Sequence, residues 1–251
     1  MKIALIGYGK MGRELERAAQ KRGHSVAARI DPTLELGATT EISLRTIGAA
    51  DVCLEFTHPE AATANIEQVV RLGKPLVVGT TGWYRHLPEV EKWVSQWKTG
   101  LVYAPNFSLG VNLFYRVAAG AARLFHRFDE YDVCGAETHH RLKADSPSGT
   151  ARQLANVVLE HFPRKKRLVV DSLNRPIEPE EFHLVSLRAG SFPGTHSLFF
   201  DSAADTLELT HTARSRAGFA SGALLAAEWI VGKQGVYTFE NVLEDLLGGM
   251  L

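Results

Sequence analysis

Short apolar runs alternate with amphipathic segments along roughly the first hundred residues. Apolar residues recur there at three- and four-residue spacing with charges between them, which predicts helices over residues 11–22, 59–72 and 86–98. Runs rich in Val, Ile and Leu, each bounded by Gly, Pro or Asp, predict strands buried on both faces at residues 3–7, 25–31, 51–57, 75–81 and 101–105. This alternation is typical of an α/β protein with a doubly wound parallel sheet of Rossmann type.

The pattern changes after Asn106. A long helical pattern over residues 109–128 is followed by period-two alternation, which predicts strands over residues 183–189, 196–201 and 206–211. Helical periodicity returns over residues 219–232 and 239–247, and we expect these helices to pack on the first domain. The chain therefore divides into a dinucleotide-binding domain, residues 1–107 completed by helices within 219–251, and a second α+β domain, residues 108–218.

Charge and composition narrow the classes of partner. The 28 basic and 28 acidic residues give a formal net charge of zero, so no broad field would attract nucleic acid or an anionic membrane. No stretch approaches the roughly 20 apolar residues of a membrane span, and the first apolar run is too short for a signal peptide. Cys53 and Cys134 lie in apolar stretches, which predicts two buried thiols. We expect a cytoplasmic protein whose partners are small molecules or other subunits.

A glycine-rich turn follows the first predicted strand. Gly7-Tyr8-Gly9-Lys10-Met11-Gly12 matches G-x-G-x-x-G and opens a predicted helix. In that context Gly7 can make the tight turn, Gly9 can admit a pyrophosphate and Gly12 can let the helix pack closely. The helix N-terminus also offers amides to phosphate. Asp31, about 20 residues beyond Gly12, can accept hydrogen bonds from ribose hydroxyls, so the sequence predicts a nicotinamide dinucleotide site.

Asp31 also bears on the choice of cofactor. Its carboxylate favours the free ribose hydroxyls of NADH and repels the 2′-phosphate of NADPH, while Lys10 and Arg13 offset part of that repulsion. We therefore expect NADH or NADPH to bind, with a preference for NADH. Gly79-Thr80-Thr81-Gly82 ends another predicted strand at the same sheet edge, where it is either a ligand contact or an ordinary turn.

The densest polar chemistry lies in residues 137–150. His139 and His140 are adjacent, so they point to opposite faces of an extended chain, and no second ligand pair sits at the usual spacing. We therefore predict no metal site. Taken alone, the run could equally be a solvated charged loop.

The segment that follows favours a binding site over a solvated loop. Ser148-Gly149-Thr150 precedes a helical pattern over residues 151–162 and supplies hydroxyl caps and amides suited to a carboxylate or phosphate. His139 and Lys143 share a face whether the chain is extended or helical, because an offset of four residues serves both periodicities. An imidazole and an ammonium beside an anion cradle suit a small substrate that bears carboxylates.

These residues resemble a known family. Residues 137–151 read E-x-H-H-x-x-K-x-D-S-P-S-G-T-A, which is similar to the signature of the 4-hydroxy-tetrahydrodipicolinate reductase (dihydrodipicolinate reductase) family of the diaminopimelate and lysine pathway. Ser146 stands where the family has alanine, and the glycine-rich loop is of the shorter form. The resemblance extends over the whole chain through Phe56-Thr57-His58-Pro59, residues 79–82, residues 104–108, residues 187–190, His196, Ser215-Arg216 and Phe219-Ala220.

The resemblance implies roles for individual residues. His139 would be the proton donor and Lys143 a ligand of a substrate carboxylate, with His140 also at the substrate and Ser148, Gly149 and Thr150 holding the second carboxylate. A positioned imidazolium fits this chemistry, because hydride reduction of a conjugated imine leaves a carbanion that must be protonated. Cofactor contacts would come from Gly7, Gly9, Lys10, Met11, Gly12, Asp31, Phe56, Thr57, Gly79, Thr80, Thr81, Ala104, Asn106 and Phe107.

The family's architecture implies that the second domain contains a mixed sheet, binds substrate and builds a homotetramer. Two other interpretations stay open at this point. Another two-domain reductase, of the aspartate or homoserine dehydrogenase type, would share the first domain without the signature at residues 137–151. A dinucleotide-sensing regulator would bind cofactor without turnover and would leave His139 and Lys143 without a role.

Overall fold

The computed structural model describes residues 1–32, 38–170 and 172–248. Two compact units are present. The first contains Met1–Leu109 and the chain from Arg216 to the end of the described residues, and the second is Gly110–Ser215. The boundaries drawn from the sequence, 107/108 and 218/219, differ by two and three residues from these limits, and the second falls in the helix Ala217–Ile230.

A six-stranded parallel sheet forms the centre of the first unit. Its order is β11-β5-β4-β3-β1-β2, the doubly wound arrangement predicted from the alternation of strands and helices. Its strands are β1 (Lys2–Ile6), β2 (Ser25–Ile30), β3 (Val52–Glu55), β4 (Leu76–Val78), β5 (Gly100–Tyr103) and β11 (Gly235–Thr238). Two differences from expectation concern the edges: β2 is only partly buried because it has one neighbour, and β11 was not predicted.

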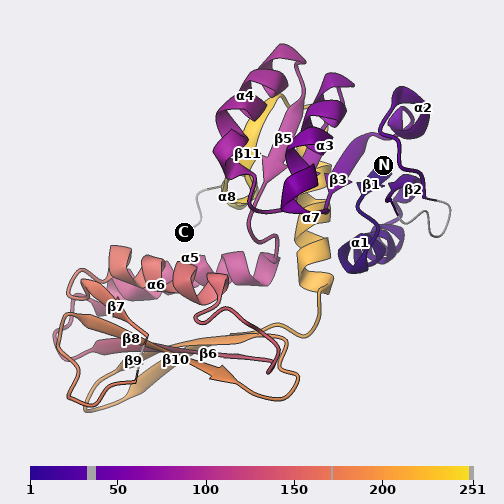
Figure 1. The fold of residues 1–251 in the computed structure, drawn as a ribbon. Coiled ribbons are helices and arrows are strands. Elements are labelled where there is room, and N and C mark those ends of the chain that lie inside the picture. The colour runs from indigo at the N-terminus through magenta and orange to yellow at the C-terminus, as the bar shows by residue number, and fades with distance from the viewer. Residues whose placement is uncertain (33–37, 171, 249–251) are drawn as a thin grey trace. The chain divides into compact units, whose positions relative to one another are not determined.

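Helices cover both faces of this sheet (Figure 1). Alternate residues of β1 show why: Ile3 and Leu5 join the core under one set of helices, whereas Ala4 and Ile6 join the core under the other. The first face carries α1 (Lys10–Lys21), α7 (Ala217–Ile230) and α8 (Phe239–Leu247), so the C-terminal helices pack on the first unit as expected. The second face carries α2 (Leu44–Ile47), α3 (Pro59–Arg71), η2 (Tyr84–His86) and α4 (Leu87–Gln96).

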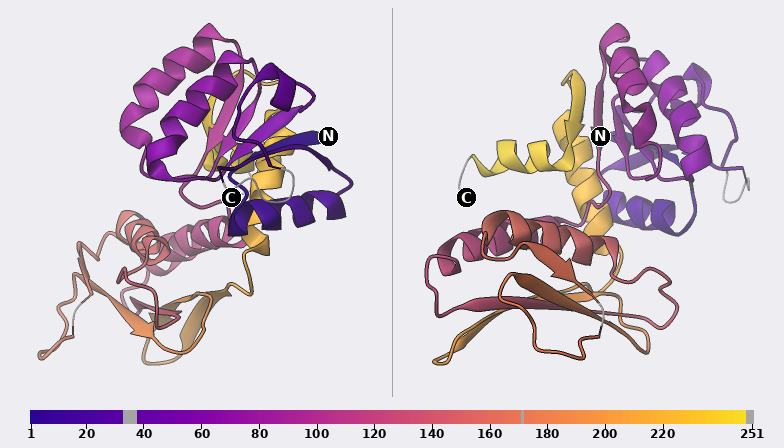
Figure 2. Two further views of the ribbon diagram at one scale, coloured as in Figure 1. Left: turned by 45° about the vertical axis from the view of Figure 1, so that its right-hand side comes forward. Right: turned by 60° about the vertical axis from the view of Figure 1, so that its left-hand side comes forward.

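A five-stranded mixed sheet forms the second unit. Its order is β10-β9-β6-β8-β7, with β6, β8 and β7 parallel and β9 and β10 antiparallel to their neighbours. The strands are β6 (Asp132–His139), β7 (Arg167–Val169), β8 (Glu181–Arg188), β9 (Thr195–Asp201) and β10 (Thr206–Thr212). Helices α5 (Leu109–Phe125) and α6 (Gly149–His161) cover one face, as both views in Figure 2 show.

The opposite face of the mixed sheet carries exposed side chains. Val185 and Leu187 of β8 are 38% and 57% exposed although both are apolar. Cys134 of β6 is exposed too, so the prediction of two buried thiols was correct for Cys53 and wrong for Cys134. The reason is that β6 alternates, and Cys134 falls on the face without helices.

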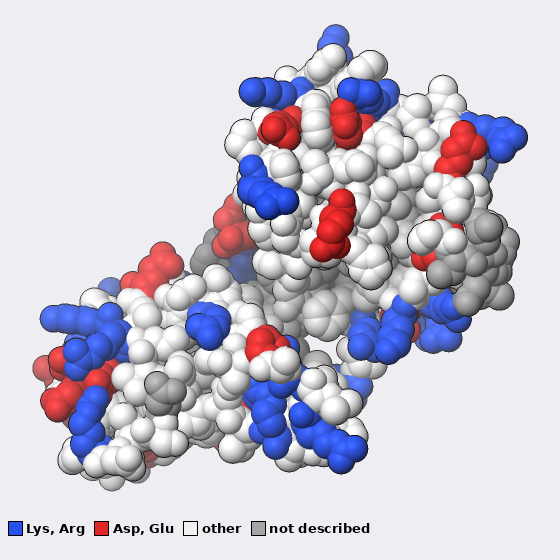
Figure 3. All heavy atoms as spheres, in the orientation of Figure 1, with Lys and Arg blue, Asp and Glu red and all other residues white. Residues whose placement is uncertain are grey.

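Charged side chains of both signs share the surface of the described residues. Lys and Arg side chains are interspersed with Asp and Glu on both units over the face shown in Figure 3. Among the helices of the described residues, none has the length and apolar character needed to cross a membrane.

Candidate active site

The glycine-rich turn closes tightly between β1 and α1. Gly7 has φ +90°, and a Cβ added there would lie 2.1 Å from the carbonyl oxygen of Phe56, so only glycine fits. A Cβ on Gly12 would lie 2.2 Å from the Gly7 carbonyl oxygen. A Cβ on Gly9 would meet nothing within 4 Å, so the backbone is open to a ligand at the first turn of α1, where Lys10 and Met11 lie. The surroundings of the three glycines thus fit the separate roles that the sequence predicts for them.

Asp31 lies beside the same turn. It follows β2, and its Oδ2 accepts a hydrogen bond from the Tyr8 amide at 2.6 Å. This bond ties the acidic side chain to the glycine-rich turn, so the predicted ribose ligand and the predicted pyrophosphate site are adjacent.

The remaining predicted cofactor residues follow β3, β4 and β5 at the carboxyl edge of the sheet. The Thr57 amide donates to Thr80 Oγ1 at 2.8 Å, and the rings of Phe56 and Phe107 lie 6.1 Å apart. A Cβ on Gly79 would lie 2.0 Å from the Phe56 ring, so that position must be glycine. The loops that contain these residues also hold Thr81, Ala104 and Asn106. The structure therefore brings all the predicted cofactor residues to one edge of one sheet.

Sequence reasoning missed one acidic residue at this edge. Glu55 ends β3 and is fully buried, and burial raises the pKa of its carboxyl group. Thr57 and Asn65 donate to its Oε1. An acid inside the apolar run of β3 was the available signal.

In the second unit, strand register assembles a buried polar cluster. Glu137 and His139 both face the helix side of the sheet, because they are two residues apart on β6. Glu137 lies opposite Ser186 of β8 on one side and His196 of β9 on the other, and His139 lies opposite Arg188. Four ionisable groups and a hydroxyl thus meet from three strands.

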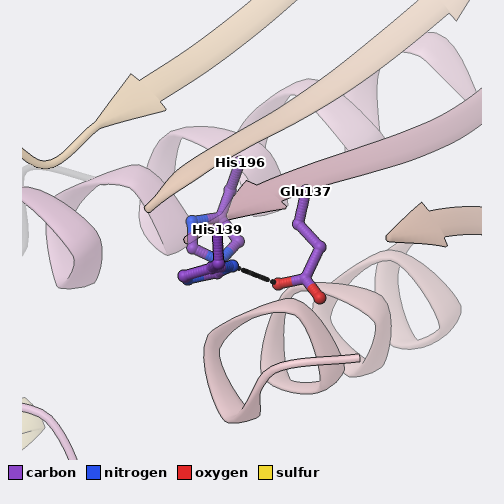
Figure 4. Close-up of side chains that lie close together, drawn as sticks. All are labelled: Glu137, His139 and His196. Atoms are coloured by element: carbon purple, nitrogen blue, oxygen red, sulfur yellow. Dashed lines mark ion pairs between the residues drawn. The ribbon is translucent and has the colours of Figure 1, made fainter. Parts of the chain in front are cut away.

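Glu137 is the centre of this cluster (Figure 4). Its Oε1 accepts hydrogen bonds from the Ser148 amide at 2.9 Å, from Ser186 Oγ at 2.8 Å and from Arg188 Nη2 at 2.8 Å. Its Oε2 lies 3.1 Å from His139 Nδ1 and 3.5 Å from His196 Nε2. Burial would raise the pKa of Glu137, but hydrogen bonds from His196, Ser148, Arg188 and Ser186 outweigh it and hold that pKa well below its usual range. Glu137 is therefore a buried anion.

His139 is neutral in this environment at neutral pH. Burial lowers the pKa of its imidazole to about 4, although the charge of Glu137 opposes that effect. His196, Lys143 and Arg188 lower the pKa of His139 further. The predicted proton donor therefore needs additional negative charge nearby before it carries a proton at neutral pH.

The loop after β6 connects the other predicted substrate residues. The sequence placed His139 and Lys143 on one face of a single strand or helix. That prediction was wrong, because β6 ends at His139 and Lys143 lies in the loop that follows. Lys143 pairs with Asp145 at 2.8 Å, and the Asp145 carbonyl oxygen accepts from Arg188 Nη2 at 2.7 Å. His140 begins the loop and is half-buried.

Ser148 caps the N-terminus of α6. Its Oγ accepts from the Ala151 amide at 3.1 Å and lies 3.2 Å from His196 Nε2. Gly149 is exposed, and a Cβ added there would meet nothing within 4 Å. Thr150 is half-buried in the first turn. The cradle expected at residues 148–150 is thus an accessible helix N-terminus of a 13-residue helix.

The cluster also has a composition that can hold a cation. One ligand atom each from Glu137, His139 and His196 lies within 4.8 Å of the others, a set of two imidazoles and a carboxylate. Sequence spacing did not reveal this set, since the prediction of no metal weighed the adjacent His139 and His140 and the lack of a second ligand pair at the usual spacing. Arg188 already supplies a positive charge to the same carboxylate.

Similarity to known proteins agrees with both units. Family models described as dihydrodipicolinate reductase, N-terminus and C-terminus, match residues 1–107 and 110–243. Relatives named 4-hydroxy-tetrahydrodipicolinate reductase are 36% identical in Christiangramia forsetii, covering 98% of this chain and 99% of that protein, and 34% identical in Staphylococcus aureus, covering 96% and 100%. The fold is shared with a dipicolinate-bound dihydrodipicolinate reductase from Paenisporosarcina sp. TG-14, with a TM-score of 0.77 and 23% identity over 96% of this chain and 98% of that one.

Proposed function

The chain belongs to the dihydrodipicolinate reductase family, and from that premise we propose how its residues carry out the reaction. The enzyme reduces 4-hydroxy-tetrahydrodipicolinate to tetrahydrodipicolinate with hydride from NAD(P)H, in diaminopimelate and lysine biosynthesis. The observation that carries our assignment of roles is the buried contact of Glu137 with both His139 and the amide of Ser148. It joins the imidazole that we assign as proton donor to the helix terminus that we assign as anion site.

The cofactor fits the glycine-rich turn of the first unit. Open space at Gly9 and the N-terminal amides of α1 suit a pyrophosphate, and Asp31 suits the adenosine ribose. NADH is the preferred cofactor in this proposal, because Asp31 repels a 2′-phosphate. The bound nicotinamide supplies hydride, and the protein supplies its position relative to the substrate.

The substrate's two carboxylates bind in the second unit. One carboxylate lies at residues 148–150, where the N-terminal amides and dipole of α6 favour negative charge. Lys143 and His140 bind the other from the loop after β6. A dicarboxylate is supported further by the relative that is described as bound to dipicolinate.

His139 transfers the proton. Loss of the 4-hydroxyl group as water leaves a conjugated imine. Hydride addition to this imine generates negative charge, and a neighbouring imidazolium both stabilises that charge and protonates the carbon. Because burial keeps His139 neutral in the free protein, the charges of the bound substrate raise its pKa and bring in the proton. The acid is therefore formed only together with its substrate.

The outer face of the mixed sheet serves assembly in this proposal. Val185 and Leu187 present exposed apolar surface there, and contact between such faces in two copies would cover them. A homotetramer built through this sheet is our proposal for the assembled enzyme.

Free thiols at Cys53 and Cys134 are compatible with the cytoplasm.

Steady-state kinetics with freshly generated 4-hydroxy-tetrahydrodipicolinate and NADH test these roles. His139→Gln should lower kcat on the order of 10²-fold with little change in KM, because the group acts in the transition state. Lys143→Ala should raise KM as well as lower kcat, and both variants should retain wild-type affinity for NADH. His161→Gln and Lys166→Ala, which change the same residue types outside the cluster, are the controls. A folded wild-type protein without turnover would refute the function, and wild-type kinetics in both site variants would refute the roles.

A further inference from the structure

One buried carboxylate is linked, directly or through Arg188, to three parts of the proposed substrate site. Glu137 is 1% exposed, and its two oxygens reach different elements. We propose that Glu137 is a positioning residue that fixes His139, the Lys143 loop and the cradle at residues 148–150 in a single arrangement. This inference rests on the proposed function, and it gives a buried side chain the role of positioning the residues that touch substrate.

The first link runs to the cradle. Glu137 Oε1 accepts the Ser148 amide proton at 2.9 Å, and Ser148 Oγ caps the Ala151 amide at 3.1 Å. The amide and the hydroxyl of Ser148 are both held inward, so the backbone of the helix N-cap is fixed from the strand side. The first turn at Gly149 stays open, because nothing lies within 4 Å of a Cβ built there.

The second link runs to the loop. Arg188 Nη2 donates both to Glu137 Oε1 at 2.8 Å and to the Asp145 carbonyl oxygen at 2.7 Å. The Asp145 carboxylate in turn pairs with Lys143 at 2.8 Å. The guanidinium has a rigid planar geometry, so it transmits the position of the buried carboxylate to the loop.

The third link runs to the imidazoles. Oε2 of Glu137 lies 3.1 Å from His139 Nδ1 and 3.5 Å from His196 Nε2. A buried carboxylate oxygen is stabilised by positive charge close to it, so this oxygen favours a protonated imidazole beside it. His139 is faced by Glu137 on its own strand, His196 on β9, Arg188 on β8 and Lys143 in the loop. Of these groups only Glu137 favours the imidazolium.

Glu181 provides a matched control in the same unit. It is also a buried carboxylate, 2% exposed, and it binds Arg175 at 2.7 Å and Arg167 at 3.0 Å and accepts from the Glu178 amide at 3.0 Å. Its partners contain none of the substrate residues. Glu137→Gln and Glu181→Gln therefore remove the same charge from similar surroundings and differ in what the carboxylate holds.

The experiment compares these two variants with Ser186→Ala, which removes one neutral hydrogen bond to Glu137. For Glu137→Gln we expect kcat to fall and the Kd of dipicolinate to rise, each on the order of 10- to 100-fold, with NADH affinity unchanged. The alkaline limb of its kcat profile should move to lower pH, because the pKa of His139 falls when the anion is removed. Ser186→Ala should raise the Kd of dipicolinate several-fold, and Glu181→Gln should lose thermal stability with unchanged kinetics.

Each outcome decides a separate question. A folded Glu137→Gln protein with wild-type kcat, dipicolinate affinity and pH profile overturns the inference, as does equal kinetic damage in Glu181→Gln. If Glu137→Gln does not fold, Ser186→Ala decides, and an unchanged Kd for dipicolinate in that variant overturns the inference. A wild-type protein that fails to reduce 4-hydroxy-tetrahydrodipicolinate refutes the proposed function instead. The affinity of the variants for dipicolinate then still tests whether Glu137 positions the residues of the site.

Discussion

Proton uptake on ligand binding follows directly from the burial of His139. With a pKa of about 4, His139 is protonated in only about 0.1% of free molecules at about pH 7. A ligand carboxylate about 4 Å from the imidazole, at an effective dielectric constant of about 20, stabilises the imidazolium form by about 4 kcal/mol. That energy raises the proton affinity of His139 about 10³-fold. Dipicolinate binding should therefore bring in about 0.5 proton per site at about pH 7 and about 0.9 at about pH 5.5.

Calorimetry measures this uptake. Dipicolinate is titrated into the protein saturated with NADH, in buffers of equal pH and different ionisation enthalpy, and the slope of observed enthalpy against ionisation enthalpy gives the number of protons taken up. His139→Gln should abolish the uptake, and His161→Gln, at the far end of α6, should leave it unchanged. A slope of zero at both pH values would refute the reasoning. Uptake that persists in His139→Gln would place the proton on another group, of which His196 is the neighbour in contact with Glu137.

Three further variants test other parts of the structure. Asp31→Ala should raise the ratio of kcat/KM for NADPH to kcat/KM for NADH by roughly tenfold, about 1.4 kcal/mol. A wild-type protein that prefers NADPH by more than roughly tenfold would contradict the role of Asp31. Gly194→Ala should lower kcat about tenfold without weakening NADH binding, because Gly194 has φ +138° and the new Cβ would lie 2.9 Å from His139 Nε2. Leu187→Asp should yield species smaller than a tetramer in sedimentation experiments, whereas an intact tetramer would exclude this face of the sheet as the interface.

The first unit was largely predictable from sequence because its signals are local. Strands buried on both faces give continuous apolar runs, and β1, β3, β4 and β5 lie inside the predicted segments or within one residue of them. The glycine-rich turn and Asp31 were found for the same reason, since a turn of a few residues contains its own constraints. The short elements α2 and β11 were missed, because four residues do not establish a period. In the second unit, the short strand β7 and the eight-residue strand β6 were not predicted either.

Only part of the substrate cluster could be predicted from the sequence. The signature at residues 137–151 identified His139, Lys143 and the cradle, and the spacing of Glu137 and His139 fits one face of a strand. The contacts of Ser186, Arg188 and His196 with Glu137 and His139 depend on the pairing of β6 with β8 and β9. These two strands are distant from β6 in the sequence. Periodicity assigns a residue to a face but not to a cross-strand neighbour, so no local signal could have joined these residues.

The arrangement also explains why a reductase would bury its proton donor. An exposed imidazole would be partly protonated at neutral pH with or without substrate, and its charge would be available to water. In the second unit, the anion at Glu137 is matched by Arg188 through one oxygen, while the other oxygen faces two imidazoles, of which His139 carries little charge at neutral pH. Negative charge brought by a ligand therefore favours the imidazolium form of His139. A bound dicarboxylate supplies that charge and brings the proton to His139 in the same event, so substrate recognition and the formation of the acid are one equilibrium.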